Sequence, residues 1–318
     1  MSNPNLAAIQ DYLNHSIIGQ SSFIEQLLIA LLADGHILVE GPPGLAKTRA
    51  VKALSECIEG DFHRVQFTPD LLPADLTGTD IFHPETASFS FQKGPIFHNL
   101  VLADEINRAP AKVQSALLEA MAEQQITVGS TSYALPKLFM VMATQNPIEQ
   151  EGTYPLPEAQ LDRFMFKLCL DYPSAEHEMA ILKLVEREEK QLPLKRPEPL
   201  SQQKLFAMRR AILEIHMADE LSQYIVDLIT ATRQPQRYSD ELAQWLEFGA
   251  SPRATLALAR SARARAWLQG RDYVTPDDIQ SLAYPVLRHR LLLSYQAQAQ
   301  GIDSEQVIAR MLELVAIA

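Results

Sequence analysis

Short runs of apolar residues alternate with helix-like stretches over the first 170 residues. The apolar runs are rich in Val, Ile, Leu and Phe, and few polar positions interrupt them. Strands that are buried on both faces of a parallel sheet have this pattern. The predicted strands cover residues 36–40, 62–67, 99–103, 138–143 and 164–168.

Helical patterns separate these strands. Residues 48–59 and 110–123 have the periodicity of amphipathic helices, and Val113, Leu117 and Met121 fall on one face of the second. Strands that alternate with helices indicate βαβ crossovers and a parallel sheet. We therefore expect an α/β domain with a parallel sheet over residues 1–170.

The pattern changes after residue 173, where the strand signals stop. Ser174 is typical of a helix N-cap, and Thr275 followed by Pro276 is typical of a helix start. We expect a second domain over residues 171–318 that is all-helical. Its predicted helices cover residues 174–190, 202–215, 219–232, 252–269, 275–290 and 304–317.

Two β-hairpins are predicted within the first domain. Residues 79–82 and 88–92 alternate around a turn at 83–86, and residues 126–128 and 133–135 form a second candidate pair. Such hairpins could pack against the domain or extend from it.

Composition and charge narrow the class of protein. The 318 residues are 47% hydrophobic and 21% charged, which permits a packed core and excludes general disorder. A net charge of -11 argues against electrostatic wrapping of nucleic acid. The N-terminus does not resemble a signal peptide, and no apolar run approaches the ~18 residues of a membrane span. Cys57 and Cys169 form neither a metal-type cluster nor a disulfide framework, so we expect a cytoplasmic protein without membrane insertion.

A glycine-rich loop, GPPGLAKT, lies between the first predicted strand and the following helix. It fits the phosphate-loop pattern except that Ala46 replaces the last glycine. Backbone N–H groups and the helix N-terminus would face a phosphate, Lys47 would reach the β- and γ-phosphates, and Thr48 would contact Mg²⁺. The alternative is a plain Gly/Pro turn. The candidate nucleotide-contacting residues here are Gly41, Pro42, Pro43, Gly44, Leu45, Ala46, Lys47, Thr48 and Arg49.

Two acids follow the third predicted strand. Asp104 and Glu105 complete the Walker B pattern of four hydrophobic residues and two acids, at the carboxyl edge of the sheet. Asp104 would hold Mg²⁺ together with Thr48, and Glu105 would polarise the attacking water. The alternative is that both acids only begin the helix near Pro110.

Three further residues are catalytic candidates. Asn146 ends the next strand and could orient water or contact the γ-phosphate, or it could belong to a simple Asn-Pro turn. Arg163 could contact the nucleotide of a neighbouring subunit, or it could pair with Asp162 or Glu158 at the surface. Arg253 lies in the first turn of a helix, where a cation is unfavourable unless an anion accompanies it, although it could be an ordinary exposed arginine.

The order of these motifs resembles the AAA+ ATPases, and specifically the MoxR subfamily. The resemblance extends over nearly the whole chain and includes residues 18–20 (IGQ), 41–48 (GPPGLAKT), 66–73 (QFTPDLLP), 94–96 (GPI), 102–110 (LADEINRAP), 144–147 (TQNP) and 155–164 (PLPEAQLDRF). It implies an αβα nucleotide-binding domain, a helical lid, and hexameric rings with ATP and Mg²⁺ at subunit boundaries. It also implies that Ile18, Gly19 and Gln20 lie near the adenine, and it leaves open whether Arg253 serves its own subunit or a neighbour.

The resemblance implies a Mg²⁺-dependent ATPase that assists the assembly, maturation or metal loading of protein clients. A separate protein with a von Willebrand factor A domain is the expected partner. One alternative is the ATPase subunit of a metal chelatase, and another is a nucleic-acid motor or transcriptional regulator on the same core. The arginine-rich region 253–271 could serve nucleic acid, but the net charge favours a solvated helix face or a subunit contact.

Overall fold

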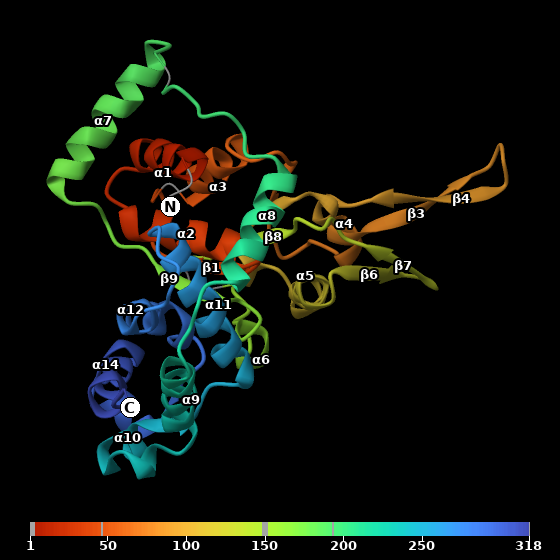
Figure 1. Ribbon diagram of the computed structural model, residues 1–318. Helices are drawn as coiled ribbons and strands as arrows, with labels where there is room; N and C mark the ends of the chain where they lie inside the picture. The colour runs from red at the N-terminus through yellow and green to blue at the C-terminus, as the bar shows by residue number, and fades with distance from the viewer. Residues whose placement is uncertain (1–3, 46, 148–151, 193, 318) are drawn as a thin grey trace.

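A five-stranded parallel sheet forms the centre of the first half (Figure 1). The computed structural model describes residues 4–45, 47–147, 152–192 and 194–317. The strands lie in the order β2-β5-β8-β1-β9. Each predicted strand is confirmed to within two residues at either end. The bounds are β1 (Ile37–Glu40), β2 (Phe62–Gln66), β5 (Leu100–Asp104), β8 (Met140–Gln145) and β9 (Phe166–Cys169).

Helices cover both faces of this sheet, which gives three layers. Alternating strand residues divide between two hydrophobic clusters, with Leu102 facing one and Val101 the other. The first cluster includes side chains of α1 (Pro4–Ser16), α2 (Ser21–Leu32) and α3 (Lys47–Glu56). The second includes those of α5 (Ala111–Glu123). The αβα arrangement is therefore confirmed, although the pattern had not predicted α1 or α2.

The second half is mainly helical, as predicted, and it also contains a short antiparallel ribbon. The ribbon pairs β10 (Leu246–Phe248) with β11 (Leu292–Leu293), so this half is not helical throughout. The ribbon joins segments that are far apart in the chain. The helices are α8 (Gln202–Leu213), α9 (Asp219–Arg233), α10 (Asp240–Trp245), α11 (Pro252–Leu268), α12 (Pro276–Leu287), α13 (Tyr295–Ala299) and α14 (Ser304–Leu314).

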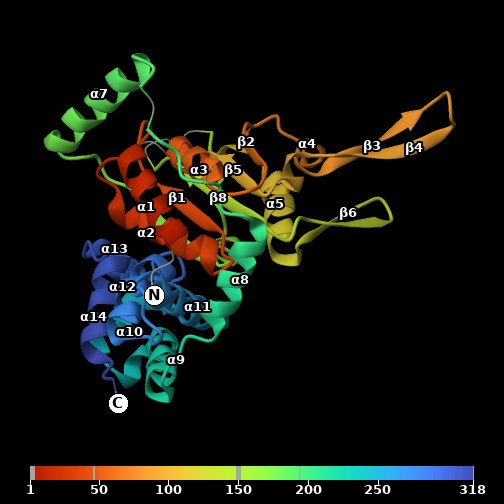
Figure 2. The same ribbon diagram turned by 45° about the horizontal axis from the view of Figure 1, so that its top comes forward.

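Helix α7 (Ala175–Glu189) follows the first half of the chain and projects outward from it (Figures 1 and 2). The Ser174 side chain accepts a hydrogen bond from the His177 N–H, which confirms the predicted N-cap. Most of the helix is solvent-exposed, but Leu184 is buried. The remaining short elements are α4 (Pro73–Thr77), α6 (Glu158–Leu161) and the 3-10 turns η1 (Pro95–Phe97), η2 (Ile106–Arg108) and η3 (Pro235–Arg237). Among the described residues, no helix is both long and apolar enough to cross a membrane.

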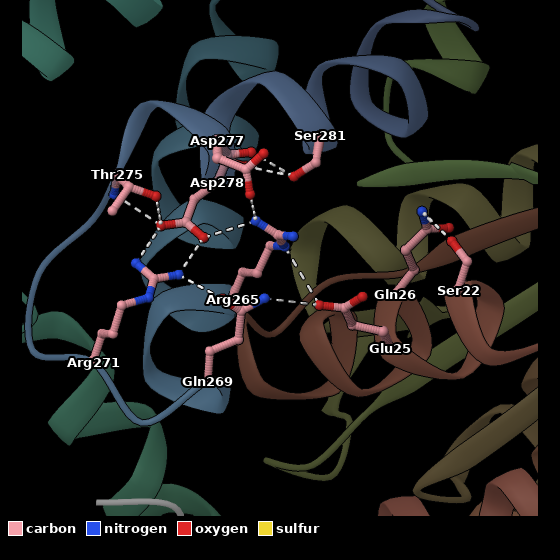
Figure 3. A network of polar contacts seen from close by, with 10 residues as sticks. All are labelled: Ser22, Glu25, Gln26, Arg265, Gln269, Arg271, Thr275, Asp277, Asp278 and Ser281. Carbon is pink, nitrogen blue, oxygen red and sulfur yellow. Dashed lines mark hydrogen bonds and ion pairs between the residues drawn. The ribbon is translucent and has the colours of Figure 1, made fainter.

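A buried carboxylate organises the contact between the second half and α2 (Figure 3). Asp278 is fully buried and accepts hydrogen bonds from Arg265, Arg271 and Thr275. Arg265 also forms an ion pair of 3.4 Å with Glu25 of α2. The two arginines of this network thus have carboxylate partners within the chain.

Both predicted hairpins are present, and both extend from the same side of the sheet (Figures 1 and 2). They are β3 (Gly78–His83) with β4 (Ser88–Lys93), and β6 (Gln125–Val128) with β7 (Thr131–Ala134). Phe91 and Tyr133 stack between the hairpins with ring centroids 4.1 Å apart. At the base of the longer hairpin, a Cβ on Gly78 would lie 2.1 Å from Gln92 O, and a Cβ on Gly94 would lie 2.2 Å from Leu76 O. Only glycine permits this close approach of the two backbones.

Candidate active site

The predicted phosphate loop connects β1 directly to α3. Lys47 is the first residue of α3, and its Nζ donates a hydrogen bond of 2.7 Å to Gly41 O, so the lysine closes the loop on itself. Burial lowers the pKa of Lys47, while the nearby carboxylates of Asp104 and Glu105 oppose this shift. Ala46 lies outside the described residues. An incoming phosphate would replace the Gly41 carbonyl as the partner of the lysine.

A cavity of about 420 Å³ brings the loop together with the acids at the ends of neighbouring strands. The strands are parallel, so their carboxyl ends meet at one edge of the sheet. Gly41 and Pro42 lie between β1 and the residues that line the cavity. The lining residues are Pro43, Gly44, Leu45, Lys47, Thr48, Arg49, Arg64, Asp104, Glu105 and Asn146.

Thr144 fixes the two acids relative to one another. Its hydroxyl donates a 2.6 Å hydrogen bond to Asp104 Oδ1 and accepts a 2.9 Å hydrogen bond from the Glu105 N–H. Glu105 has a left-handed backbone with φ of 57°. Such a conformation is uncommon for a residue with a side chain, and it occurs often at functional sites. The strand ends thus hold both carboxylates in defined positions.

Two side chains of β2, Arg64 and Gln66, donate hydrogen bonds to these carboxylates. Arg64 donates to Asp104 Oδ2 from Nε at 3.0 Å and from Nη2 at 2.7 Å. Gln66 Nε2 donates to Glu105 Oε2 at 2.7 Å, and Arg108 forms an ion pair of 3.0 Å with the same oxygen. Sequence reasoning missed Arg64 and Gln66. Their spacing of two residues on a strand was the signal that both point to one face.

The donor set also fits a magnesium ion. The Thr48 hydroxyl and the Asp104 carboxylate line one cavity, and oxygen is the ligand atom that Mg²⁺ prefers. Magnesium at nucleotide sites is usually held by one or two protein oxygens, with phosphates and water as the remaining ligands. These two side chains satisfy that requirement.

A small cavity of about 90 Å³ adjoins the phosphate loop. Ile18, Gln20 and Leu45 line it from one side, and Ile181 and Leu184 line it from α7. A largely apolar cavity beside a phosphate site suits the face of an adenine ring. Ile18 and Gln20 therefore line a cavity next to the phosphate loop, and their contact with adenine stays a prediction.

Gly19 and Arg49 connect this cavity to α7. Gly19 has φ of 79°, and a Cβ at this position would lie 2.8 Å from His177 Nδ1. Arg49 donates from Nε to Ser16 O at 2.8 Å and pairs with Glu188 of α7. The position of α7 is thus tied to the residues around the predicted adenine site.

Arg163 and Arg253 lie at the other edge of the sheet. Both line a separate cavity of about 290 Å³, together with Gly35 and His36, which immediately precede β1. The phosphate loop follows β1, so the four-residue strand, roughly 13 Å long, separates the two sites. Arg163 Nη1 donates to Leu118 O at 2.6 Å, and Arg253 Nη1 lies 3.4 Å from Asp162 Oδ2. The structure therefore does not bring these two arginines together with Lys47 and Asp104.

Comparisons with known proteins agree with this geometry. Residues 36–166 match the model of the ATPase family associated with various cellular activities, and residues 242–311 match the AAA lid domain. The chain is 45% identical to "Chaperone MoxR1" of Mycobacterium tuberculosis over 302 residues, which covers 95% of this chain and 79% of that protein. It is 33% identical to "Protein MoxR" of Paracoccus denitrificans, covering 89% of this chain and 87% of that protein. The chain belongs to the MoxR family of AAA+ ATPases.

Structural similarity leads to the same family of folds. A crystal structure from Cytophaga hutchinsonii, of a protein described there as a candidate ATPase, superimposes with a TM-score of 0.91. It is 46% identical in sequence and covers 99% of this chain and 95% of its own. The "Uncharacterized protein YeaC" of Bacillus subtilis is 44% identical, over 99% of this chain and 95% of that protein.

Membership of the MoxR family establishes the expected fold and the general activity. The protein is an ATP-hydrolysing enzyme with a parallel-sheet AAA+ domain and a helical lid. The AAA model spans Lys47, Asp104 and Arg163, and the lid model spans Arg253.

Proposed function

We propose that this MoxR-family protein is a Mg²⁺-dependent ATPase that acts as a ring and remodels protein clients. Residues 1–170 would form the nucleotide-binding domain and residues 171–318 the lid. The observation that carries the ring is the separation of the two sets of charged residues. Lys47 and Asp104 lie at the carboxyl edge of the sheet, whereas Arg163 and Arg253 lie at the amino edge.

This separation favours the assignment of Arg163 and Arg253 to a neighbour's nucleotide. An arginine stabilises charge on the transferred phosphoryl group only at contact distance. The length of β1 separates these arginines from the phosphate loop of the same subunit. In a ring of head-to-tail copies, the amino edge of the sheet in one subunit would face the carboxyl edge of the sheet in the next.

The residues of the large cavity divide the chemical work. Lys47 would bind the β- and γ-phosphates after releasing Gly41 O, and Asn146 would hold the γ-phosphate or the water. Glu105 would accept the proton of the attacking water once Gln66 releases its carboxylate. Magnesium, held by Thr48 and Asp104, would neutralise phosphate charge when bound.

Client contact is the remaining part of the proposal. The long hairpin β3–β4 exposes Phe82 and Phe89, which are 50% and 70% accessible. Exposed aromatic side chains favour a protein contact over a packed interior. The fit of a von Willebrand factor A domain partner, and a role in metal loading, follow from the family resemblance and from the acidic net charge of this chain.

Two variants test the assignments within one chain. Lys47→Ala should lose nucleotide binding. Glu105→Gln should retain it and lower kcat by about 10²-fold or more, because the general base is removed. Glu220→Gln, on the exposed surface of α9, is the matched control and should behave like the wild type. Unchanged turnover in Glu105→Gln would refute its role as the base.

Partner capture tests the client role. Glu105→Gln with ATP should hold the ring in its nucleotide-bound form. A purified von Willebrand factor A domain protein of the same cell should then bind more strongly with ATP than with ADP. Equal binding in both nucleotide states would contradict a client cycle that ATP drives.

A further inference from the structure

Arg290 is a buried arginine that follows the end of α12. Its side chain is 2% exposed, and its guanidinium donates hydrogen bonds in several directions. Nε donates to Asp162 Oδ1 at 2.8 Å, Nη1 to Met165 O at 3.2 Å, and Nη2 to Asp162 O at 3.2 Å and to Phe164 O at 2.6 Å. Nη1 also donates to Val286 O of α12. The partners outside α12 all belong to residues 162–165.

Those residues flank Arg163. The neighbouring His289 adds to the contact, since its Nε2 donates to Phe164 O at 3.1 Å. Burial and the adjacent Arg290 charge lower the pKa of His289 well below its usual value, so the ring is neutral. Two consecutive residues of the lid therefore hold the backbone on which Arg163 is carried.

Asp162 extends the contact to the second arginine. Its Oδ1 binds Arg290, while its Oδ2 accepts from Ser251 Oγ at 2.7 Å and lies 3.4 Å from Arg253 Nη1. Arg163 is fixed at its far end by the hydrogen bond to Leu118 O. One carboxylate thus links Arg290 to the segments that carry both arginines.

The chemistry of Arg290 suits positioning of the Arg163 backbone better than mere attachment of the lid to the first half. Burial of an ion pair contributes little net stability compared with apolar packing, so a lid could be attached without one. A guanidinium, however, presents several N–H groups in a fixed plane and can set the directions of several carbonyls at once. Arg290 meets three carbonyl oxygens and one carboxylate oxygen of the Arg163 segment in this way.

We propose that Arg290 is a positioning residue that couples the lid, which itself carries Arg253, to the segment that carries Arg163, and so to hydrolysis of the neighbouring subunit's ATP. The inference rests on the proposed trans action of these arginines. Movement of the lid would reach Arg163 through Asp162 and the carbonyls of residues 162–165. The lid of one subunit would therefore influence turnover in the next.

The variant Arg290→Lys tests this role, because it keeps the charge and loses the planar set of donors. We expect kcat to fall by about tenfold to a hundredfold, as for a misplaced catalytic group, while the Kd for ATP stays within about twofold. Arg288→Lys is the matched control. Arg288 also joins the lid to β9, because its Nη1 donates to Lys167 O at 3.0 Å. Its other partner is Glu305 of α14, within the lid, and no hydrogen bond links it to residues 162–165. Its kcat should stay near the wild-type value.

Mixing two variants distinguishes an effect on the neighbouring subunit's nucleotide site from damage to the nucleotide site of the mutated subunit itself. Glu105→Gln subunits retain intact arginines, so they can serve a neighbour whose own arginines are misplaced. In an equal mixture of Glu105→Gln with Arg290→Lys, about a quarter of the boundaries of a head-to-tail ring would combine an intact site with intact arginines. ATPase activity should therefore rise above that of either variant alone, and a parallel mixture of Glu105→Gln with Arg163→Ala should show the same rise.

The two mixtures distinguish failure of the Arg290 proposal from failure of the proposed trans action. A rise with Arg163→Ala but none with Arg290→Lys would overturn the role of Arg290 and leave the proposed function standing. No rise in either mixture of confirmed oligomers would reject trans action, and the role of Arg290 with it. If Arg290→Lys does not fold, Asp162→Asn replaces it, since it preserves shape and removes the charge that joins Arg290 to Arg253. The same rise is then required of Asp162→Asn.

Discussion

The buried carboxylate of Asp278 should be worth more to stability than any other acid in its network. In Asp278→Ala, two hydrogen bonds from Arg271, one from Arg265 and two from Thr275 would be lost. The neighbouring Asp277 provides the comparison. It is 78% exposed at its side chain and accepts one hydrogen bond from Arg265.

The expected magnitude follows from burial. Removal of one partner of a buried ion pair typically costs 3–5 kcal/mol, and loss of a helix N-terminal cap costs about 1 kcal/mol more. Arg265 retains Glu25 and Asp277, which reduces the total, so we expect Asp278→Ala to cost about 4 kcal/mol. Asp277→Ala should cost less than about 1 kcal/mol, as is usual for an exposed pair.

Fluorescence can follow this change selectively, because both tryptophans, Trp245 and Trp267, lie in the second half. A loss of about 4 kcal/mol corresponds to a fall in Tm of roughly 6 °C if the whole chain unfolds together, and about twice that if the second half unfolds alone. Burial raises the pKa of Asp278, but hydrogen bonds from Arg271 and Thr275 outweigh it and lower the pKa overall. The stabilisation is thus present above the unfolded pKa near 4 and is lost as pH falls further. Equal Tm values for Asp278→Ala and Asp277→Ala would refute the reasoning.

Three further predictions concern the first half. Burial lowers the pKa of His36 to about 4, so its neutral form stabilises the fold fully above about pH 6.5. The free energy of unfolding should fall between pH 6.5 and 4, and more steeply in the wild type than in His36→Gln. Denaturant midpoints measured across this pH range would show the difference, and equal pH dependence in the two proteins would contradict it. Gly19→Ala should weaken ATP binding, because φ is positive at this residue and a Cβ would meet the His177 side chain. Adding His177→Ala to Gly19→Ala should restore part of the binding. No restoration in the double variant would exclude the steric cause. Tyr133→Ala should cost about 1 kcal/mol of hairpin stability through loss of the stack on Phe91, read out as faster proteolysis of β3–β4; unchanged cleavage would refute it.

The periodic parts of the chain were predictable because their burial is regular. The strands of the sheet lie between two helical layers, so an apolar run is both the sequence signal and the structural cause. The hairpins had a different signal, alternating residues around a turn, since β3 and β4 are largely exposed. Helix α2 was missed because every residue from Leu27 to Leu32 is buried, so that no polar face marks this part as a helix.

The site was predictable only where adjacent residues carry it. The phosphate loop and Asp104-Glu105 are local patterns, and the structure places them around one cavity. Arg64, Gln66 and Arg290 act through residues 39 to 128 positions away, and no local pattern encodes such pairs. Their functions depend on the register of the sheet and on the docking of the lid.

The two glycines at the base of the β3–β4 hairpin have a mechanical consequence. The backbones at Gly78 and Gly94 approach too closely for a Cβ, and this close packing leaves little freedom for a hinge. The hairpin would then move as a stiff lever that is fixed to α4. Each of its strands has six residues, or about 20 Å, so a rotation of about 10° at the base would carry the tip about 3.5 Å. A small rearrangement of α4 would thus become a displacement large enough to shift a bound protein segment by one residue.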